Sequence, residues 1–209
     1  MGRNISSKCK QCRRAGQKLF LKAERCASPK CAMVKRNFPP GVHGGKGYGR
    51  LTDYGLQLRE KQKAKKIYRI LEKQFKNYIL QAFKSKTNSE QVLIEALEMR
   101  LDNVFFRAGF AKSRDLARQV IGHGHVLVNG KRVNIPSFQV KTGQIISLKE
   151  KSQSMKIFSN LKESLKKTES SSWLSINPDK LEIKITDKPK LEETKGEFDP
   201  KLIIEFYSR

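Results

Sequence analysis

The chain has 209 residues, a formal net charge of +24 and a pI near 10.1. Its length and its apolar fraction of 37% allow one or two domains with a buried core. Such a positive charge makes nucleic acid the leading partner, with an anionic membrane surface second. No apolar run approaches the roughly 20 residues that span a bilayer, so no membrane-spanning segment is expected.

The positive charge is concentrated toward the N-terminus. Residues 1–50 carry 13 Lys and Arg against one acidic residue, whereas residues 151–209 carry 12 against 10. We therefore expect polyanion binding in the N-terminal three quarters of the chain and a structural scaffold in the last quarter.

All four cysteines lie near the N-terminus, as the pairs Cys9/Cys12 and Cys26/Cys31. A CxxC pair delivers two thiolates to one ion, and the chain shows no export signal that would favour disulfides. The spacing predicts one structural metal ion held by four thiolates. Zinc is the first choice, and an iron–sulfur cluster on the same ligands is the alternative. Four protein ligands leave no open position for catalysis.

The next segments are a connector and a helical region. Residues 37–50 are rich in Pro and Gly, which predicts an extended arm that is ordered only against a partner. Thr52 or Asp53 can cap a helix, and apolar residues at three- and four-residue steps continue to Phe83. This pattern predicts one amphipathic helix or two in series. A further helix is expected from Ser89 to Phe105.

The pattern then changes to that of a small α+β unit. Ser113 can cap a short helix that ends at Gly122, and Asn129-Gly130 is a two-residue hairpin signal between strands. The remaining strand candidates are residues 144–148, 181–185 and 202–206.

Cations cluster on this α+β unit. Arg114 and Arg118 lie four residues apart on the predicted short helix, with Lys112 just before its cap, so they can form a phosphate-binding face. Lys131 and Arg132 in the hairpin add a second row. His123 and His125 are interpreted as RNA hydrogen-bonding or backbone-positioning residues, because a complete metal site is already supplied. No group of nucleophile, base and orienting residue is found, which argues against an enzyme.

Several segments in order resemble one family over nearly the full length. They are Asp53–Lys63, Arg100–Val104, Ser113–Gln119, His123–Gly130 and Glu205–Arg209. Together they resemble bacterial small-subunit ribosomal protein four in its zinc-containing form.

The resemblance implies an α+β fold. It consists of a mostly helical domain with an N-terminal four-Cys zinc knuckle, and an inserted small α+β RNA-binding module. The expected divisions are 1–98 for the knuckle and helical domain, 99–160 for the module, and 161–209 for a C-terminal segment that packs back on the helices.

The resemblance also implies a function and partners. The implied role is that of a structural constituent of the small ribosomal subunit, which binds 16S rRNA at a multi-helix junction and nucleates assembly of the subunit body. Neighbouring small-subunit proteins, including protein five, are implied partners, near where messenger RNA enters. A cytoplasmic, ribosome-bound location follows, with no small-molecule substrate. Contributions to translational accuracy and to repression of its own message belong to the same implication.

Two alternatives remain open at this point. One is an RNA-modifying enzyme, and the other is a zinc-containing translational regulator, each carrying the same RNA-binding module.

The candidate RNA-binding residues follow from the basic segments and from positions that match the family. They are Arg13, Arg14, Lys35, Arg36, Arg50, Arg59, Lys61, Lys63, Lys66, Lys112, Arg114, Arg118, Gln119, His123, His125, Lys131 and Arg132.

Overall fold

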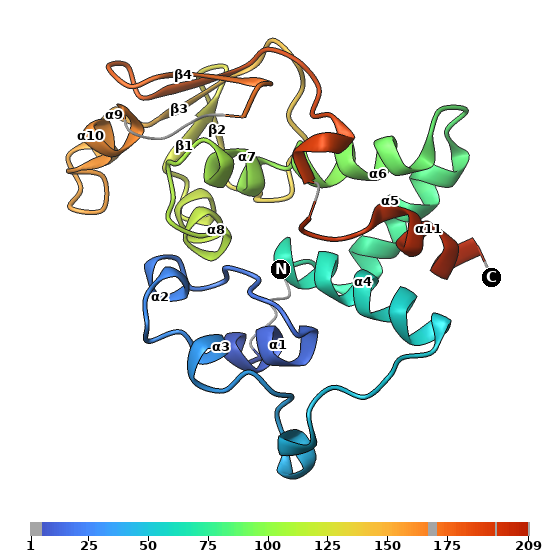
Figure 1. The fold of residues 1–209 in the computed structure, drawn as a ribbon. Helices are drawn as coiled ribbons and strands as arrows, with labels where there is room; N and C mark the ends of the chain where they lie inside the picture. Colours follow the sequence, from blue (N-terminus) through green and yellow to red (C-terminus); the bar gives the residue numbers. More distant parts are fainter. Residues whose placement is uncertain (1–5, 167–170, 195, 209) are drawn as a thin grey trace. The chain divides into compact units, whose positions relative to one another are not determined.

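The computed structural model describes residues 6–166, 171–194 and 196–208. The chain divides into two compact units (Figure 1). The helical unit runs to Ile94 and resumes at Thr194, and the sheet unit is Glu95–Glu193.

Helices make up the first unit. Their bounds are α1 Lys8–Ala15, α2 Glu24–Ala27, α3 Ala32–Lys35, the 3-10 helix η1 Val42–Lys46, α4 Asp53–Ile67, α5 Glu72–Lys84, α6 Ser89–Glu98, which crosses into the sheet unit, and α11 Pro200–Ser208.

The expected helical region is confirmed as two helices in series, α4 and α5. Thr52 Oγ1 accepts a hydrogen bond from the Gly55 amide at 3.2 Å, which caps α4. Between the helices Arg69 adopts a left-handed conformation with φ of 55°, so the chain turns before α5 begins. Ala64 of α4 and Phe75 and Ile79 of α5 are fully buried.

The C-terminal helix α11 packs on α4. Phe206 stacks near Tyr54 with ring centroids 5.6 Å apart, and Ile203 is fully buried. Gln57 of α4 donates to a carboxylate oxygen of Glu205 at 3.1 Å. The interpretation of residues 202–206 as a strand was therefore wrong. A short, mostly apolar segment fits a strand and a buried helix equally well, and contact with α4 decides between them.

The sheet unit contains a five-stranded antiparallel sheet in the order β2-β1-β3-β5-β4. The elements are α7 Leu101–Arg107, α8 Arg114–Gly122, β1 Val126–Val128, β2 Lys131–Val133, β3 Ile145–Leu148, α9 Glu150–Gln153, α10 Leu161–Lys166, β4 Leu174–Asn177, β5 Glu182–Ile185 and the 3-10 helix η2 Leu191–Thr194.

One hydrophobic core joins α7 and α8 to the strands. Val104 and Phe105 of α7, Ile121 of α8, Val126 of β1 and Ile146 of β3 are all fully buried in it. Figure 1 shows α7 and α8 on one side of the sheet. The alternation of buried and less buried residues along β1 and β3 is the pattern of a sheet covered on one face.

The helix cap and the hairpin turn predicted for this unit are confirmed. Ser113 Oγ accepts from the Leu116 amide at 3.2 Å, which caps α8. Asn129 and Gly130 have φ of 47° and 76°, as a type I′ turn requires. The left-handed glycine after α8 is Gly124, with φ of 76°, whereas Gly122 is the last helical residue.

The helix expected from Ser89 to Phe105 is interrupted. α6 ends at Glu98 and α7 begins at Leu101, because Arg100 forms an isolated antiparallel bridge with Gln139. The Leu101 amide also donates to the Phe138 carbonyl at 2.9 Å. Backbone pairing between segments so far apart in sequence is not visible in a local hydrophobic pattern.

The division of the C-terminal part also differs from the expected one. β5 pairs with β3, with Ile146 opposite Ile183, and β4 pairs with β5. Trp173 is buried in the same core. The sheet unit therefore extends to Glu193, and the segment that returns to the helices starts at Thr194 instead of residue 161. β4 was not expected, because its apolar–polar alternation covers only four residues and ends at the turn residues Asn177 and Pro178.

Within the described ranges, no helix is long and apolar enough to cross a membrane.

Glu72 links α4, α5 and α11. Lys61 and Lys65 form ion pairs with its carboxylate, and the Tyr207 hydroxyl donates to it at 2.7 Å. Partial burial opposes ionisation of Glu72, but the hydrogen bonds from Lys61, Lys65 and Tyr207 outweigh burial and lower its pKa to about 2.

We expect Glu72→Gln to lower the free energy of unfolding at pH 7 by about 1 kcal/mol, a small value because solvent screens the half-exposed carboxylate. The lowered pKa means that this stabilisation is present above about pH 4.5 and is lost as the pH falls toward 2. Urea denaturation at several pH values measures the difference between the two proteins. Exposed Glu163→Gln is the matched control and should change little at any pH. A Glu72→Gln effect that stays constant from pH 7 to 3 would contradict this role.

Candidate nucleic-acid interface

The cysteine segment folds around its thiols. α1 places Cys9 and Cys12 about one turn apart, α2 carries Cys26, and Cys31 stands directly before α3, which packs on α1. Cys12, Cys26 and Cys31 are buried and Cys9 is half-buried. The Lys22 amide donates to Cys26 Sγ at 3.3 Å. This places four sulfur atoms in one small region of the helical unit.

The fit of these thiols to a metal ion is partial. Burial raises the pKa of the Cys12 thiol, and the nearby Cys26, Cys9 and Cys31 raise it further. All four thiols are thus near one another. Among the residues that the structure describes, however, no three His, Cys, Asp or Glu side chains are gathered closely enough to hold a metal ion. The donor set suits zinc, whose positive charge would stabilise the thiolates that burial disfavours.

The connector 37–50 is held against α1. Arg13 Nε donates to the Phe38 carbonyl at 2.9 Å and its Nη2 to the Pro39 carbonyl at 3.2 Å. The guanidinium also lies 4.7 Å from the Phe38 ring centroid. At the other end of the connector, the Tyr48 hydroxyl donates to the Arg13 carbonyl at 2.7 Å. The connector therefore has contacts within the chain itself, which its Pro- and Gly-rich composition did not predict.

These contacts form one side of a cleft of about 360 Å³, which α4 lines on the other side. Three expected RNA-binding residues, Arg14, Arg59 and Lys66, line it together. Burial lowers the pKa of Lys66, and repulsion from Lys65 and Arg14 lowers it further. Tyr48 also lines the cleft and was not among the expected residues. In the sequence, the position of this aromatic residue between two glycines in a basic segment could have indicated an RNA contact.

Other basic residues of α4 face the interior. Lys61 is 7% exposed, forms an ion pair with Glu72 and lies 4.7 Å from the Phe206 ring centroid. Lys63 is also buried and forms an ion pair with Glu60 at 2.8 Å. The basic run 59–66 is thus divided between internal ion pairs and the cleft.

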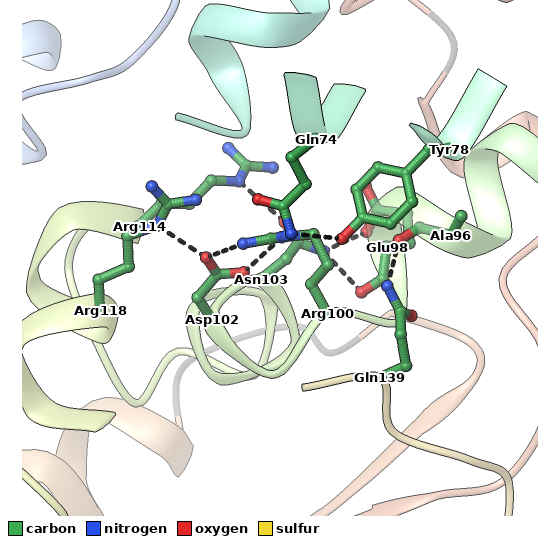
Figure 2. A network of polar contacts seen from close by, with 10 residues as sticks. All are labelled: Gln74, Tyr78, Ala96, Glu98, Arg100, Asp102, Asn103, Arg114, Arg118 and Gln139. Atoms are coloured by element: carbon green, nitrogen blue, oxygen red, sulfur yellow. Dashed lines mark hydrogen bonds and ion pairs between the residues drawn. The ribbon is translucent and has the colours of Figure 1, made fainter. Parts of the chain in front are cut away.

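The arginines of α8 contact α7. Arg118 Nε donates to Asp102 at 2.7 Å, and Arg114 Nε donates to Asn103 Oδ1 at 2.8 Å (Figure 2). Asp102 also receives two hydrogen bonds from Arg100, at 3.0 and 2.8 Å. Burial lowers the pKa of Arg118, while Asp102 opposes this effect. Both α8 arginines therefore help to hold α7 and α8 together, in addition to any RNA contact.

The turn after α8 is shaped by Arg132. Its guanidinium occupies the space where a Cβ at Gly124 would lie, and its Nη2 donates to the His123 carbonyl at 3.4 Å. His125 Nδ1 shares a hydrogen bond with Ser152 Oγ at 2.9 Å, and the two histidine rings are 5.9 Å apart. Lys131 is exposed on the same hairpin. Arg132 thus lies beside His123 at this turn, while Lys131 is exposed next to Arg132 on β2.

The expected RNA-binding residues differ in exposure. The exposed ones are Arg14, Lys35, Arg36, Arg50, Lys112, Gln119, His123, Lys131 and Arg132. The half-buried ones are Arg13, Arg59, Lys66, Arg114, Arg118 and His125, and the buried ones are Lys61 and Lys63.

Comparison with known proteins identifies the family. Residues 3–98 match the ribosomal protein S4/S9 N-terminal domain, and residues 99–146 match the S4 domain. The small ribosomal subunit protein uS4 of Thermus thermophilus is 46% identical over 209 residues, and the protein of the same name from Halothermothrix orenii is also 46% identical. Both alignments cover the whole of both chains. The chain belongs to the uS4 family. Its fold of helices with a small antiparallel sheet includes the S4 domain that the uS4 resemblance implied.

The Asp102 network gives a prediction for stability. Asp102 is 2% exposed and Arg100 is 1% exposed. Asp102→Asn should lower the free energy of unfolding by about 3–5 kcal/mol, because it leaves a buried arginine without its carboxylate. Urea denaturation measures this change, and Asp179→Asn on an exposed turn is the control. A decrease below about 1 kcal/mol would show that the network contributes little to stability.

Proposed function

We propose that the chain is a structural constituent of the small ribosomal subunit that binds 16S rRNA directly at a multi-helix junction. In this role it nucleates assembly of the subunit body and has no catalytic activity. The observation that carries the proposal is the 46% identity, over the whole chain, to proteins named small ribosomal subunit protein uS4.

The charge distribution supports this function. The net charge of +24 and the exposed cations of the N-terminal region and the hairpin favour phosphate binding. Affinity comes mainly from release of counterions from the RNA, and selectivity comes from the shape of the junction.

The same proposal covers partners and location. Neighbouring small-subunit proteins, including protein five, contact the chain near where messenger RNA enters, and the chain is cytoplasmic and ribosome-bound. It contributes to translational accuracy and represses its own message.

Cys9, Cys12, Cys26 and Cys31 hold one structural zinc ion in this proposal. The support is the position of four thiols in one region, three of them buried, and the amide hydrogen bond to Cys26. Zinc would supply folding free energy to a basic segment that has few apolar residues.

Lys131 and Arg132 give a clearer test of RNA binding than Arg114 and Arg118, because both are exposed and the bond of Arg132 to the His123 carbonyl is long, at 3.4 Å. Replacing both hairpin residues with Gln should weaken binding to a 16S rRNA transcript. The slope of log affinity against log salt should fall by roughly one unit for each phosphate that the variant no longer neutralises. Filter binding at several salt concentrations measures both quantities.

The control is the double variant Lys180→Gln/Lys184→Gln, which removes the same charge from exposed positions on β5 and on the turn before it. It should leave the slope unchanged. Sedimentation of cell extract tests the wider proposal. Absence of the chain from the small subunit would overturn it in favour of an RNA-modifying enzyme or a free translational regulator.

Metal analysis of the purified protein should give about one zinc per chain. Cys26→Ser should reduce the zinc content and increase amide exchange in residues 8–36, while α4 and α5 remain protected. Stoichiometric iron with labile sulfide would show that the cysteines hold an iron–sulfur cluster instead of zinc. A folded cysteine segment with no metal would contradict both the zinc assignment and the cluster assignment.

A further inference from the structure

The cleft between α1, the connector and α4 combines an apolar wall with three cations. Its volume of about 360 Å³ lies within the roughly 300–1,000 Å³ of small-ligand sites. Tyr48, Leu51 and Leu58 supply apolar surface, while Arg14, Arg59 and Lys66 supply charge. This composition suits a ligand that has both a flat apolar part and an anionic part.

Tyr48 is fixed in position before any ligand binds. Its hydroxyl is bound to the Arg13 carbonyl, and Arg13 is itself bound to the carbonyls of Phe38 and Pro39. The ring lies against Gly16 at the end of α1, where an added Cβ would be 3.5 Å from two ring atoms. The side chain is still 38% exposed. A ring held in this way loses little conformational entropy when a planar group stacks on it.

The cations of the cleft differ from the neighbouring lysines of α4, which form ion pairs with acidic residues. Lys61 and Lys65 form ion pairs with Glu72, and Lys63 with Glu60. Within the described ranges, Arg14, Arg59 and Lys66 have no hydrogen bond or ion pair to an acidic side chain. Three cations that line one cleft, one of them a half-buried lysine, favour binding of an anion there.

We propose that this cleft holds one unpaired nucleotide of the bound RNA, with its base stacked on Tyr48 and its phosphate facing Arg14, Arg59 and Lys66. The inference rests on the proposed rRNA-binding function and names a site for it. Proteins that recognise RNA by sequence mostly use unstacked bases, which rest on aromatic side chains while cations bind the backbone. A free phosphate would use the cations but leave the ring without a partner.

The test uses the full chain and a 16S rRNA transcript. Tyr48→Leu should weaken binding by about tenfold and leave the salt slope unchanged, because stacking releases no counterions. Arg59→Gln and Lys66→Gln should each lower the salt slope by roughly one unit. Phe20→Leu is the control, since Phe20 is an exposed aromatic residue outside the cleft lining. It should change the affinity by less than about twofold.

A second measurement does not depend on how well a variant folds. Transcript containing 4-thiouridine, crosslinked to the unchanged protein, should give nucleotide adducts on the peptide that contains Tyr48. In NMR titrations, the Tyr48 ring signals should respond to adenosine 5′-monophosphate. An equal response to inorganic phosphate or to an acidic peptide would overturn the nucleotide assignment.

The experiments distinguish a wrong assignment of the cleft from a wrong proposed function. If the chain binds the transcript but Tyr48→Leu binds equally well and no adduct forms, the cleft inference fails and rRNA binding stands. If the unchanged chain does not bind the transcript, the proposed function fails.

Discussion

The packing of α11 on α4 organises the helical unit. Residues far apart in sequence meet there, with Gln57 bound to Glu205 and Lys61 beside the ring of Phe206. The Asp199 amide donates to Glu60 at 3.0 Å, which fixes the start of the returning segment. Because both ends of the chain contribute to one helical unit, the sheet unit is an insertion between them in the sequence.

The basic residues of α4 have different partners. Lys61 is paired with Glu72 and lies against the rings of Phe206 and Tyr207, and Lys63 is paired with Glu60. The other cations, Arg59 and Lys66, line the cleft with Arg14 of α1. The covered lysines stabilise the fold, and the uncovered cations are available to an anionic partner. A single basic run thus has two physical roles, which depend on whether a carboxylate lies within reach of each side chain.

The sheet unit divides its basic residues in a comparable way. Asp102 binds Arg100 and Arg118, and Glu98 binds Arg107 and Asn103, so acidic residues of the interior position several arginines. Lys131 and His123 stay exposed on the hairpin side of the unit. Arg114 and Arg118 are half-buried and are hydrogen-bonded to Asn103 and Asp102 of α7, so they are neither internal nor fully exposed. Their packing against α7 gives them fixed positions, and a fixed guanidinium is well suited to binding phosphate.

The sequence by itself determined the local elements and the chemical class of the partner. Caps at Thr52 and Ser113 and the Asn129-Gly130 turn are readable because a single side chain or backbone preference sets each of them. Tertiary structure alone decided that residues 202–206 form a helix, that β4 and β5 extend the sheet, and that Lys61 and Lys63 are internal. These outcomes depend on partners far away in sequence, such as α4 for α11 and β3 for β5. The sequence shows where each lysine is, but only the packing decides whether that lysine pairs with a carboxylate or is free to bind a polyanion.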